Sequence, residues 1–247
     1  MRRSIFLAVV LVEKGTTLQN LVLEMVRTIQ ENRFYFLLLA AFVLVGGVYL
    51  ALTNKIDGIL FFSNNRTNFL NEAFVLLTKM GEAPMYFLIG ILALAVRVRY
   101  ALLVGVTGLT VLGTSFSLKM LFAVDRPMAY ITKQNLLHEF SFIDGVHLHT
   151  GATSFPSGHT MSAFAIYGLL VYFFPNKKRY ALLFFCLSLL VGLSRMYLVQ
   201  HFWPDVYVGG IIGAFLALLI FNLQSRIEAQ KYNWLDRPLY QIGRKLG

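Results

Sequence analysis

The sequence predicts an all-α integral membrane protein with six transmembrane helices, an amphipathic N-terminal segment and both termini in the cytoplasm. Of its 247 residues, 57% are hydrophobic and only 14% are charged, whereas a soluble domain carries about 25% charged residues. Several apolar runs come close to the roughly 20 residues needed to cross a bilayer. No polar or Pro/Gly/Ser-rich linker separates these runs, so we expect residues 1–247 to form a single membrane domain.

The N-terminal segment, residues 1–33, is expected to lie at the membrane surface. Its basic start resembles a signal peptide, but Glu13-Lys14 follows the short apolar core instead of a small-residue cleavage site, so we expect residues 1–12 to be retained. Apolar residues then recur at helical spacing with polar residues opposite them, which predicts an amphipathic helix. These apolar residues are Leu18, Leu21, Val22, Met25, Val26 and Ile29.

Six segments are then expected to cross the membrane. They are residues 34–53, 84–96, 100–122, 157–174, 180–199 and 204–223. The second is short for a span, and residues 72–80 before it are expected to lie at the interface. Residues 224–247 form a polar, basic tail, which we expect in the cytoplasm.

The distribution of basic residues predicts the orientation. With six spans both termini lie on one side, and 15 of the 22 lysines and arginines belong to segments on that side. Cytoplasmic segments carry the excess of Lys and Arg, so the termini are expected in the cytoplasm. The net charge of +10 then reflects this bias, and we expect a lipid bilayer and no nucleic acid as partner.

Three polar stretches fall at the ends of predicted spans on the opposite, outer side. They read KMLFAVDRP (119–127), FPSGHT (155–160) and SRMYLVQHFWPD (194–205). The residues singled out in them comprise three permanent cations, two histidines and one carboxylate: Lys119, Arg126, Arg195, His159, His201 and Asp205. A charged side chain at a helix centre costs roughly 2.5–3.5 kcal/mol on insertion scales, so a set of such residues at one membrane face indicates a functional site.

This residue set suits a phosphate group. The first backbone N–H groups of a helix beginning at FPSGHT point at any anion placed there, and glycine permits close approach of the backbone. Arginine binds two phosphate oxygens at once, while lysine acts as a point charge. The candidate phosphate-binding residues are Lys119, Arg126, Ser157, Gly158 and Arg195.

Two histidines and an aspartate supply candidate catalytic groups. His201 and Asp205 are four residues apart, so the carboxylate can accept the Nδ1–H of the imidazole and leave Nε2 with a lone pair. This arrangement makes His201 a candidate nucleophile. His159 can donate a proton to the leaving oxygen and later take one from water.

The three stretches resemble the signature of the type-2 phosphatidic acid phosphatase superfamily. The shared pattern is Lys, six residues, Arg-Pro; then Pro-Ser-Gly-His; then Ser-Arg, five residues, His, three residues, Asp, and every fixed position between Lys119 and Asp205 matches. The resemblance implies a metal-independent phosphatase without a cofactor. It implies that His201 forms a phosphohistidine oriented by Asp205, that His159 acts as acid and base, and that the five candidate phosphate-binding residues hold the phosphoryl oxygens.

The sequence leaves the substrate open. Phosphatidate, phosphatidylglycerophosphate, undecaprenyl diphosphate and the 1-phosphate of lipid A all fit, and the short connections suggest a bacterial inner membrane with the site facing the periplasm or the outside. Two alternatives are a phosphotransferase using the same phosphohistidine and a transporter whose charges line a pathway. The oligomeric state is not indicated.

The connection 128–154 contains His147 and His149. A metal site there is disfavoured, since no cysteine and no carboxylate stands at ligand spacing. A lid over the site or a selector of the lipid headgroup fits a connection of this length better.

Overall fold

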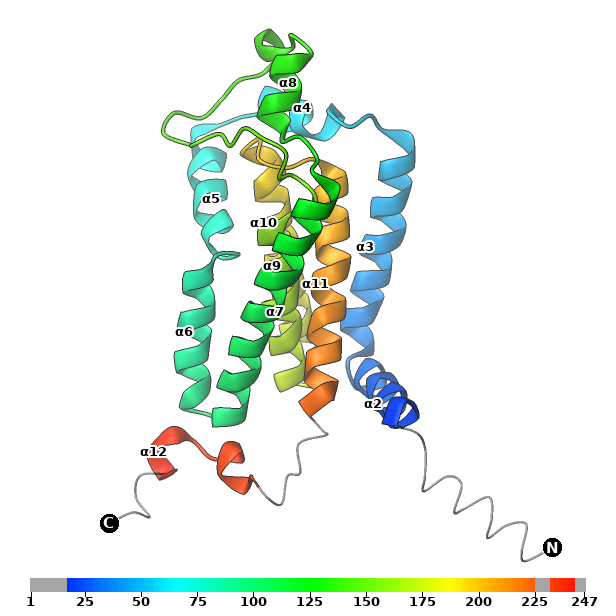
Figure 1. Cartoon of the computed structure of the whole chain (residues 1–247), viewed down its shortest axis with the longest axis vertical. Coiled ribbons are helices and arrows are strands. Elements are labelled where there is room, and N and C mark those ends of the chain that lie inside the picture. The colour runs from blue at the N-terminus through cyan, green and yellow to red at the C-terminus, as the bar shows by residue number, and fades with distance from the viewer. Residues whose placement is uncertain (1–16, 225–231, 243–247) are drawn as a thin grey trace, which may run out of the picture.

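The computed structural model describes residues 17–224 and 232–242, so the expectations for residues 1–12 and for much of the tail lie outside the described residues. Every regular element among the described residues is helical, as predicted. Figure 1 shows the long helices running side by side along the long axis of the molecule. They are α3 (Arg33–Leu52), α7 (Val98–Phe122), α9 (Gly158–Phe173), α10 (Lys178–Tyr197) and α11 (Trp203–Leu223).

Four segments of the described chain are long and apolar enough to cross a membrane: α3, α10, α11 and Val98–Lys133, which contains α7. A fifth crossing arises if α5 (Asn68–Lys79) and α6 (Ala83–Leu94) form one span, since the pair is bent by 59° at a short break. Residues 72–80, expected at the interface, therefore belong to the same bent pair as the predicted second span. Helix α9 is apolar but has only 16 residues, so helix length and composition do not confirm the predicted number of six.

Helix α9 forms the centre of the bundle. Twelve of its 16 residues are buried, and it packs against α7, α10 and α11. Glycines on α11 allow this packing, because a Cβ atom at Gly209 would lie 2.8 Å from the carbonyl oxygen of Ser157. The start of α9 is thereby fixed against the first turns of α11.

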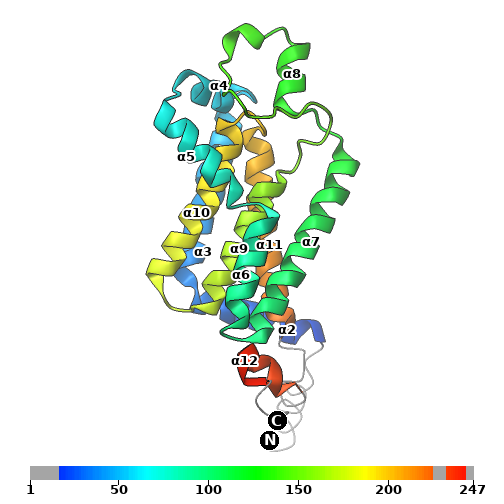
Figure 2. The ribbon, with the colours of Figure 1, turned by 90° about the vertical axis from the view of Figure 1, so that its left-hand side faces the viewer.

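The two ends of the bundle differ. Helices α4 (Asp57–Asn64) and α8 (Pro127–Lys133) and the 3₁₀ turn η1 (Leu137–Glu139) lie at one end, here called the α8 end. Helix α2 (Thr17–Glu31) lies at the opposite end with the C-terminal η3 (Asn233–Asp236) and α12 (Leu239–Ile242), as Figure 2 shows. Helix α2 confirms the predicted N-terminal helix.

The C-terminal segment is attached to the start of α7. Arg99 donates two hydrogen bonds to the carboxylate of Asp236, at 2.9 and 2.8 Å, and Leu235 is buried. The backbone N–H of Val98 also donates to the carbonyl oxygen of Arg237. These contacts hold the described part of the tail at the α2 end.

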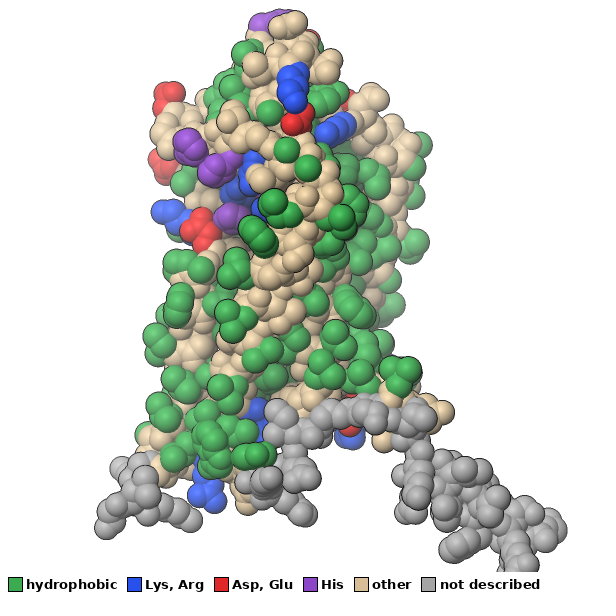
Figure 3. Space-filling view, viewed as in Figure 1, with side chains coloured by type: hydrophobic (Ala, Val, Ile, Leu, Met, Phe, Trp, Pro, Cys, Tyr) green, Lys and Arg blue, Asp and Glu red, His purple; other side chains and the backbone are tan. Residues whose placement is uncertain are grey.

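The surface is apolar along the bundle and polar at the α8 end. Figure 3 shows hydrophobic side chains along the helices, while histidines and most of the visible charged side chains gather near the α8 end. Large apolar side chains of α3, α6 and α7 are exposed, among them Leu44, Phe87 and Leu109. In a membrane protein such a surface faces lipid.

Candidate active site

The three polar stretches meet at the α8 end, at the termini of α7, α8, α9, α10 and α11. Lys119 lies in the last turn of α7, and Arg126 is the residue before α8. Ser157 caps the start of α9, as the sequence predicted for a helix opening at FPSGHT. Arg195 lies in the last turn of α10 and Asp205 in the first turn of α11. Figure 3 shows basic and histidine side chains together in this region.

His201 and Asp205 are in contact and almost fully buried. Nδ1 of His201 lies 3.4 Å from Oδ2 of Asp205, and the side chains are 1% and 3% exposed. His201 lies in the short connection before α11, so the pair bridges a loop and a helix. The contact uses Nδ1 and leaves Nε2 of the imidazole outside it.

Oδ2 of Asp205 has further donors that hold the carboxylate in place. The backbone N–H of Phe202 donates to it at 2.9 Å, and the hydroxyl of Ser154 donates to the same oxygen. The hydroxyl oxygen of Ser154 also lies 3.5 Å from Nδ1 of His201. Ser154 was not among the predicted site residues; its position three residues before Ser157 is the only sequence signal for it.

Arg195 and Arg126 are buried with few partners. Arg195 is 6% exposed and donates to the hydroxyl of Thr78 at 2.5 Å. Its buried Nε has no hydrogen-bond partner among the described residues, so a donor remains for an anion. Arg126 is 8% exposed and donates to Thr153 at 3.1 Å and to the backbone carbonyl of Gln200 at 3.3 Å.

The start of α9 faces Lys119. Nζ of Lys119 lies 3.7 Å from the place that a Cβ atom on Gly158 would occupy, and the hydroxyl of Ser115 lies 3.0 Å from it. Any side chain at position 158 would fill this space. The oxygen of the Ser157 hydroxyl accepts from the Thr160 hydroxyl at 2.9 Å, which leaves the Ser157 hydroxyl hydrogen for another acceptor.

His159 stands at the open side of the site. Its side chain is 31% exposed, and its Nε2 lies 3.5 Å from Oε1 of Glu82. Glu82 lies at the break between α5 and α6, where Gly81 allows the backbone to pass: a Cβ atom there would lie 2.8 Å from the carbonyl oxygen of His159. Glu82 was not among the predicted site residues, because no sequence pattern connects residues 72–96 with the three motifs.

The basic side chains of the site interact electrostatically with His159 and His201. His159 lies close enough to His201, Arg195, Lys119 and Arg126 to interact with them electrostatically. Burial lowers the pKa of His201 to about 3; Asp205 acts in the opposite direction, while Arg195 and Arg126 lower the pKa further. His201 is therefore neutral near pH 7, and the tautomer that donates its Nδ1–H to Asp205 carries the lone pair on Nε2.

Two apolar grooves run along the bundle, and one of them reaches the site. The first, here called the α6–α7 groove, has a volume of about 650 Å³ and lies between α6, α7 and α9. Its lining includes Ser115 and Gly158 at the site and Leu94 and Ala101 at the far end. At 1.5 Å per helical residue, it extends about 21 Å along α7.

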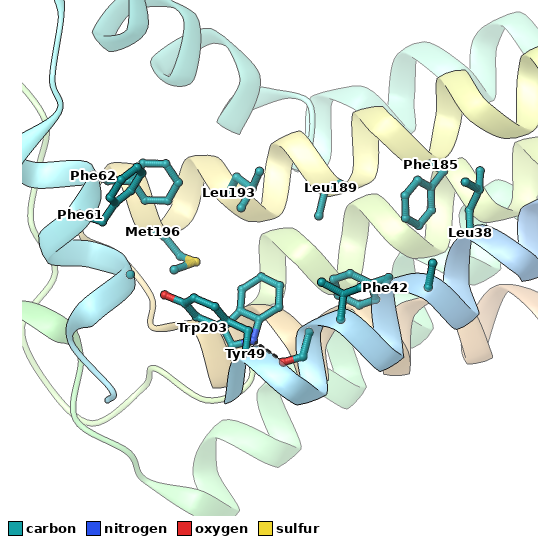
Figure 4. A pocket seen from close by; sticks show the side chains of 14 residues that line it. Leu38, Phe42, Tyr49, Phe61, Phe62, Phe185, Leu189, Leu193, Met196 and Trp203 are labelled. Carbon is teal, nitrogen blue, oxygen red and sulfur yellow. Dashed lines mark hydrogen bonds between the residues drawn. The ribbon is translucent and has the colours of Figure 1, made fainter. Parts of the chain in front are cut away.

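The second groove, of about 480 Å³, lies between α3, α4, α10 and α11 and contains no predicted site residue. Figure 4 shows its lining, with Phe42, Leu189 and Met196 around an apolar space, and Trp203 donating to the carbonyl oxygen of Gly46. Of these two grooves in the described part of the chain, the α6–α7 groove is therefore the one that joins an apolar surface to the cluster of cations.

The sequence of this chain is similar to those of known proteins. The profile of the PAP2 superfamily matches residues 87–228. Phosphatidylglycerophosphatase B of Bacillus subtilis (strain 168) is 34% identical over 89 residues, which cover 33% of this chain and 44% of that protein. Undecaprenyl-diphosphatase BcrC of the same organism is 27% identical over 130 residues, covering 53% of this chain and 61% of that protein. The matches thus span about half the length of these relatives.

Solved structures support the same fold. LpxE of Aquifex aeolicus superposes with a TM-score of 0.56 at 26% identity, covering 66% of this chain and 92% of that one. The profile covers more than half of the chain, and the residues of all three signature stretches meet in one place. The chain therefore belongs to the PAP2 superfamily, as the resemblance of its three polar stretches predicted.

Proposed function

We propose that this protein is an integral membrane lipid phosphatase that works through a phosphohistidine at His201. The observation that carries the proposal is the buried contact between His201 and Asp205, at 3.4 Å, beside three cations and the start of a helix. A neutral, oriented imidazole next to an anion site is the arrangement that nucleophilic catalysis on phosphorus requires.

In the first step, the Nε2 lone pair of His201 attacks phosphorus and the bond from phosphorus to the lipid oxygen breaks. Asp205 accepts the Nδ1–H and stabilises the charge that develops on the ring. His159 gives a proton to the leaving oxygen. The phosphoryl oxygens are held by Lys119, Arg126, Ser157, Gly158 and Arg195, which spread the negative charge of the transition state.

In the second step, His159 takes a proton from water as the water oxygen attacks the phosphohistidine. The bond between phosphorus and Nε2 of His201 breaks, inorganic phosphate leaves, and the imidazole is neutral again. None of the roles given to these residues needs a metal or cofactor, and we propose a metal-independent reaction.

The α6–α7 groove supports a lipid substrate. It is lined almost wholly by apolar side chains, opens along the membrane-facing surface and ends at Gly158. A lipid that enters sideways from the bilayer would place its phosphate at the start of α9 and its hydrocarbon chain in this groove. Burial of the chain adds affinity without demanding one chemical structure for the lipid.

The topology proposed here has six crossings, with α5–α6 counted as one and α9 as another. Helix α9 has only 16 residues, but most of them are buried by neighbouring helices. A helix enclosed in this way can cross the membrane with a shorter apolar segment than a helix that faces lipid. The basic segments at the α2 end then lie in the cytoplasm, with α2 on that surface. The site faces the outside of a bacterial inner membrane.

A panel of lipid phosphates in detergent tests the proposal. Phosphatidate, phosphatidylglycerophosphate, undecaprenyl diphosphate and lipid A 1-phosphate are each given to the purified protein, and inorganic phosphate is measured. Release from at least one of them without an added acceptor supports the phosphatase. Release only in the presence of a lipid or sugar acceptor would indicate a phosphotransferase instead.

A transporter is the alternative from another class. It predicts that no phosphoenzyme forms and that the His201→Ala variant still moves substrate across vesicles. After incubation with a ³²P-labelled lipid phosphate, an acid-labile label on the wild-type protein that is absent from His201→Ala would indicate an enzyme and not a transporter.

A further inference from the structure

The chain on both sides of Glu82 is hydrogen-bonded to α9. Before it, the backbone carbonyl of Met80 accepts a hydrogen bond from the hydroxyl of Tyr167 on α9 at 3.0 Å. After it, the hydroxyl of Tyr86 on α6 donates to the backbone carbonyl of Ser162 on α9 at 3.1 Å. The break between α5 and α6 is therefore fixed to the helix that carries the proposed acid and base of the reaction.

Gly81 lets this break come close to His159. A Cβ atom on Gly81 would lie 2.8 Å from the carbonyl oxygen of His159 and 2.7 Å from a methyl carbon of Val191. The next residue, Glu82, places Oε1 at 3.5 Å from Nε2 of the same histidine. Glu82 is the residue before α6, yet its carboxylate makes no capping bond to that helix. The carboxylate is thus in contact with the imidazole and not with the start of its own helix.

His159 lies among permanent positive charges. Lys119, Arg126 and Arg195 are close enough to interact with it electrostatically, and each of them disfavours a further positive charge on the ring. A general acid, however, must carry its proton before the leaving oxygen departs. Glu82 supplies a carboxylate in contact with the ring, and this negative charge offsets the repulsion from the three cations.

We propose that Glu82 is a positioning residue for His159, whose Nε2–H its carboxylate accepts. The contact orients the ring and stabilises the imidazolium. Nδ1 of His159 then gives its proton to the leaving oxygen in the first step and takes one from water in the second, so the ring ends each turnover as it began. The inference rests on the proposed phosphatase function. Glu82 supports the acid as Asp205 supports the nucleophile, but it lies outside the three polar stretches.

The test compares two substrates of nearly the same size, 4-nitrobenzyl phosphate and 4-nitrophenyl phosphate. The first releases an alkoxide, which needs a proton to leave, whereas the second releases 4-nitrophenolate, which leaves readily without one. The measured quantity is kcat/KM, because it covers only the steps up to the loss of the leaving group. If the protein hydrolyses only lipids, a long-chain alkyl phosphate and a long-chain nitroaryl phosphate take the place of this pair.

Glu82→Gln should lower kcat/KM for the alkyl phosphate about 10-fold, the lower end of the value of a hydrogen bond to a charged group, because both side chains are partly exposed. The aryl phosphate should change less than about twofold, since its departure needs no acid. Glu72→Gln is the matched control, because Glu72 is an exposed glutamate of α5, and it should change neither substrate.

His159→Ala sets the upper limit of the effect. It should lower kcat/KM for the alkyl phosphate about 100-fold or more, with a much smaller loss for the aryl phosphate. Adding Glu82→Gln to His159→Ala should cause no further loss, since the glutamate acts through the imidazole. The ratio of the two substrates does not depend on the fraction of folded protein, so it can be read even in a variant that is partly unfolded.

An equal loss on both substrates would overturn the proposal, since it would mean that Glu82 only supports the fold or Arg195, with which it also interacts electrostatically. An equal gain would overturn it as well, because the carboxylate would then only repel the anionic substrate. A further loss in the double variant would show that Glu82 acts independently of His159. If the wild-type protein releases phosphate from none of these compounds and from no lipid, the phosphatase proposal itself fails, and that outcome is distinct from the others.

Discussion

Ser154 and Asp205 are joined by a hydrogen bond across 51 residues of the sequence, from the serine hydroxyl to Oδ2 of the aspartate. The same oxygen lies 3.4 Å from Nδ1 of His201 and accepts the N–H of Phe202 at 2.9 Å. Three donors on one oxygen fix the carboxylate, and the carboxylate fixes the imidazole. This chain of contacts is the basis of the first two predictions.

His201→Ala should abolish phosphate release. Without Nε2 there is no nucleophile, and loss of a covalent step of this kind costs several orders of magnitude in rate. The measurement is inorganic phosphate released under saturating substrate. His138→Ala is the control that keeps its activity, since His138 is an exposed histidine of the connection 128–154 beside Glu139. More than a few per cent of residual hydrolysis would show that another residue is the nucleophile.

Ser154→Ala should lower kcat about 10- to 100-fold and leave KM nearly unchanged, because a hydrogen bond to a charged carboxylate contributes about 1.5–3 kcal/mol. The control is Ser188→Ala, an equally buried serine that donates to Ala163 and Phe184 far from the motifs. A shift of the acidic limb of the pH–rate profile in Ser154→Ala alone would mark a positioning role. If both variants lose stability and activity in proportion, Ser154 only supports the fold.

Much of this site was predictable because polar residues in an apolar chain are rare and costly. Lys119, Arg126, His159, Arg195 and Asp205 stand out in the sequence for that reason, and they converge in the structure. Their partners do not stand out. Thr78, Ser154 and Gln200 are ordinary polar residues, and only the packing of α5, the connection before α9 and the α10–α11 connection brings them to Arg195, Asp205 and Arg126.

The helices, too, could be predicted from the sequence only in part. The apolar runs predicted α3, α7, α10 and α11 closely, since these helices meet lipid on one side and read as continuous apolar segments. The break between α5 and α6 falls between the predicted segments 72–80 and 84–96, whereas their pairing at an angle of 59° and the close approach of Gly81 to His159 are tertiary features that no local pattern reveals.

Acid should destabilise the folded protein partly through His201. The pKa of His201 is lowered to about 3 by burial, while an unfolded histidine has a pKa of about 6.5. Below pH 6.5 the unfolded chain binds a proton that the folded chain does not, so stability is full above that value and falls by up to about 1.4 kcal/mol per pH unit down to pH 3. Thermal unfolding in detergent between pH 7.5 and 5 should show a smaller loss for His201→Gln. Equal slopes in both proteins would contradict the prediction.

Removal of divalent metals should leave activity unchanged. The proposed roles belong to imidazoles, guanidinium groups and backbone N–H groups, none of which needs a metal ion to act on phosphate. Phosphate release is measured after dialysis against a chelator, with a metal-dependent phosphatase treated in parallel. Strong inhibition that is reversed by added metal would instead point to His147 and His149 as ligands.

The last prediction concerns the lipid chain. Gly105 lines the α6–α7 groove, and a Cβ atom there would meet no side chain and no neighbouring helix within 4 Å. Gly113 lies on the same helix with the same free space around its Cβ position and does not line the groove. Gly105→Leu and Gly113→Leu therefore add the same side chain from a Cβ atom in open space, and both gain the same helix propensity.

Gly105→Leu should raise KM for a long-chain lipid phosphate about 10-fold, since the leucine occupies space otherwise taken by methylene groups worth about 0.8 kcal/mol each. The same variant should hydrolyse a short-chain, water-soluble phosphate as the wild type does. Gly113→Leu should leave both substrates unaffected. Because the reacting groups lie at the other end of the groove, kcat at saturation should change little. If the two leucine variants behave alike on the long-chain lipid, the hydrocarbon chain does not occupy this groove, and the lipid must reach Gly158 along another face of the bundle.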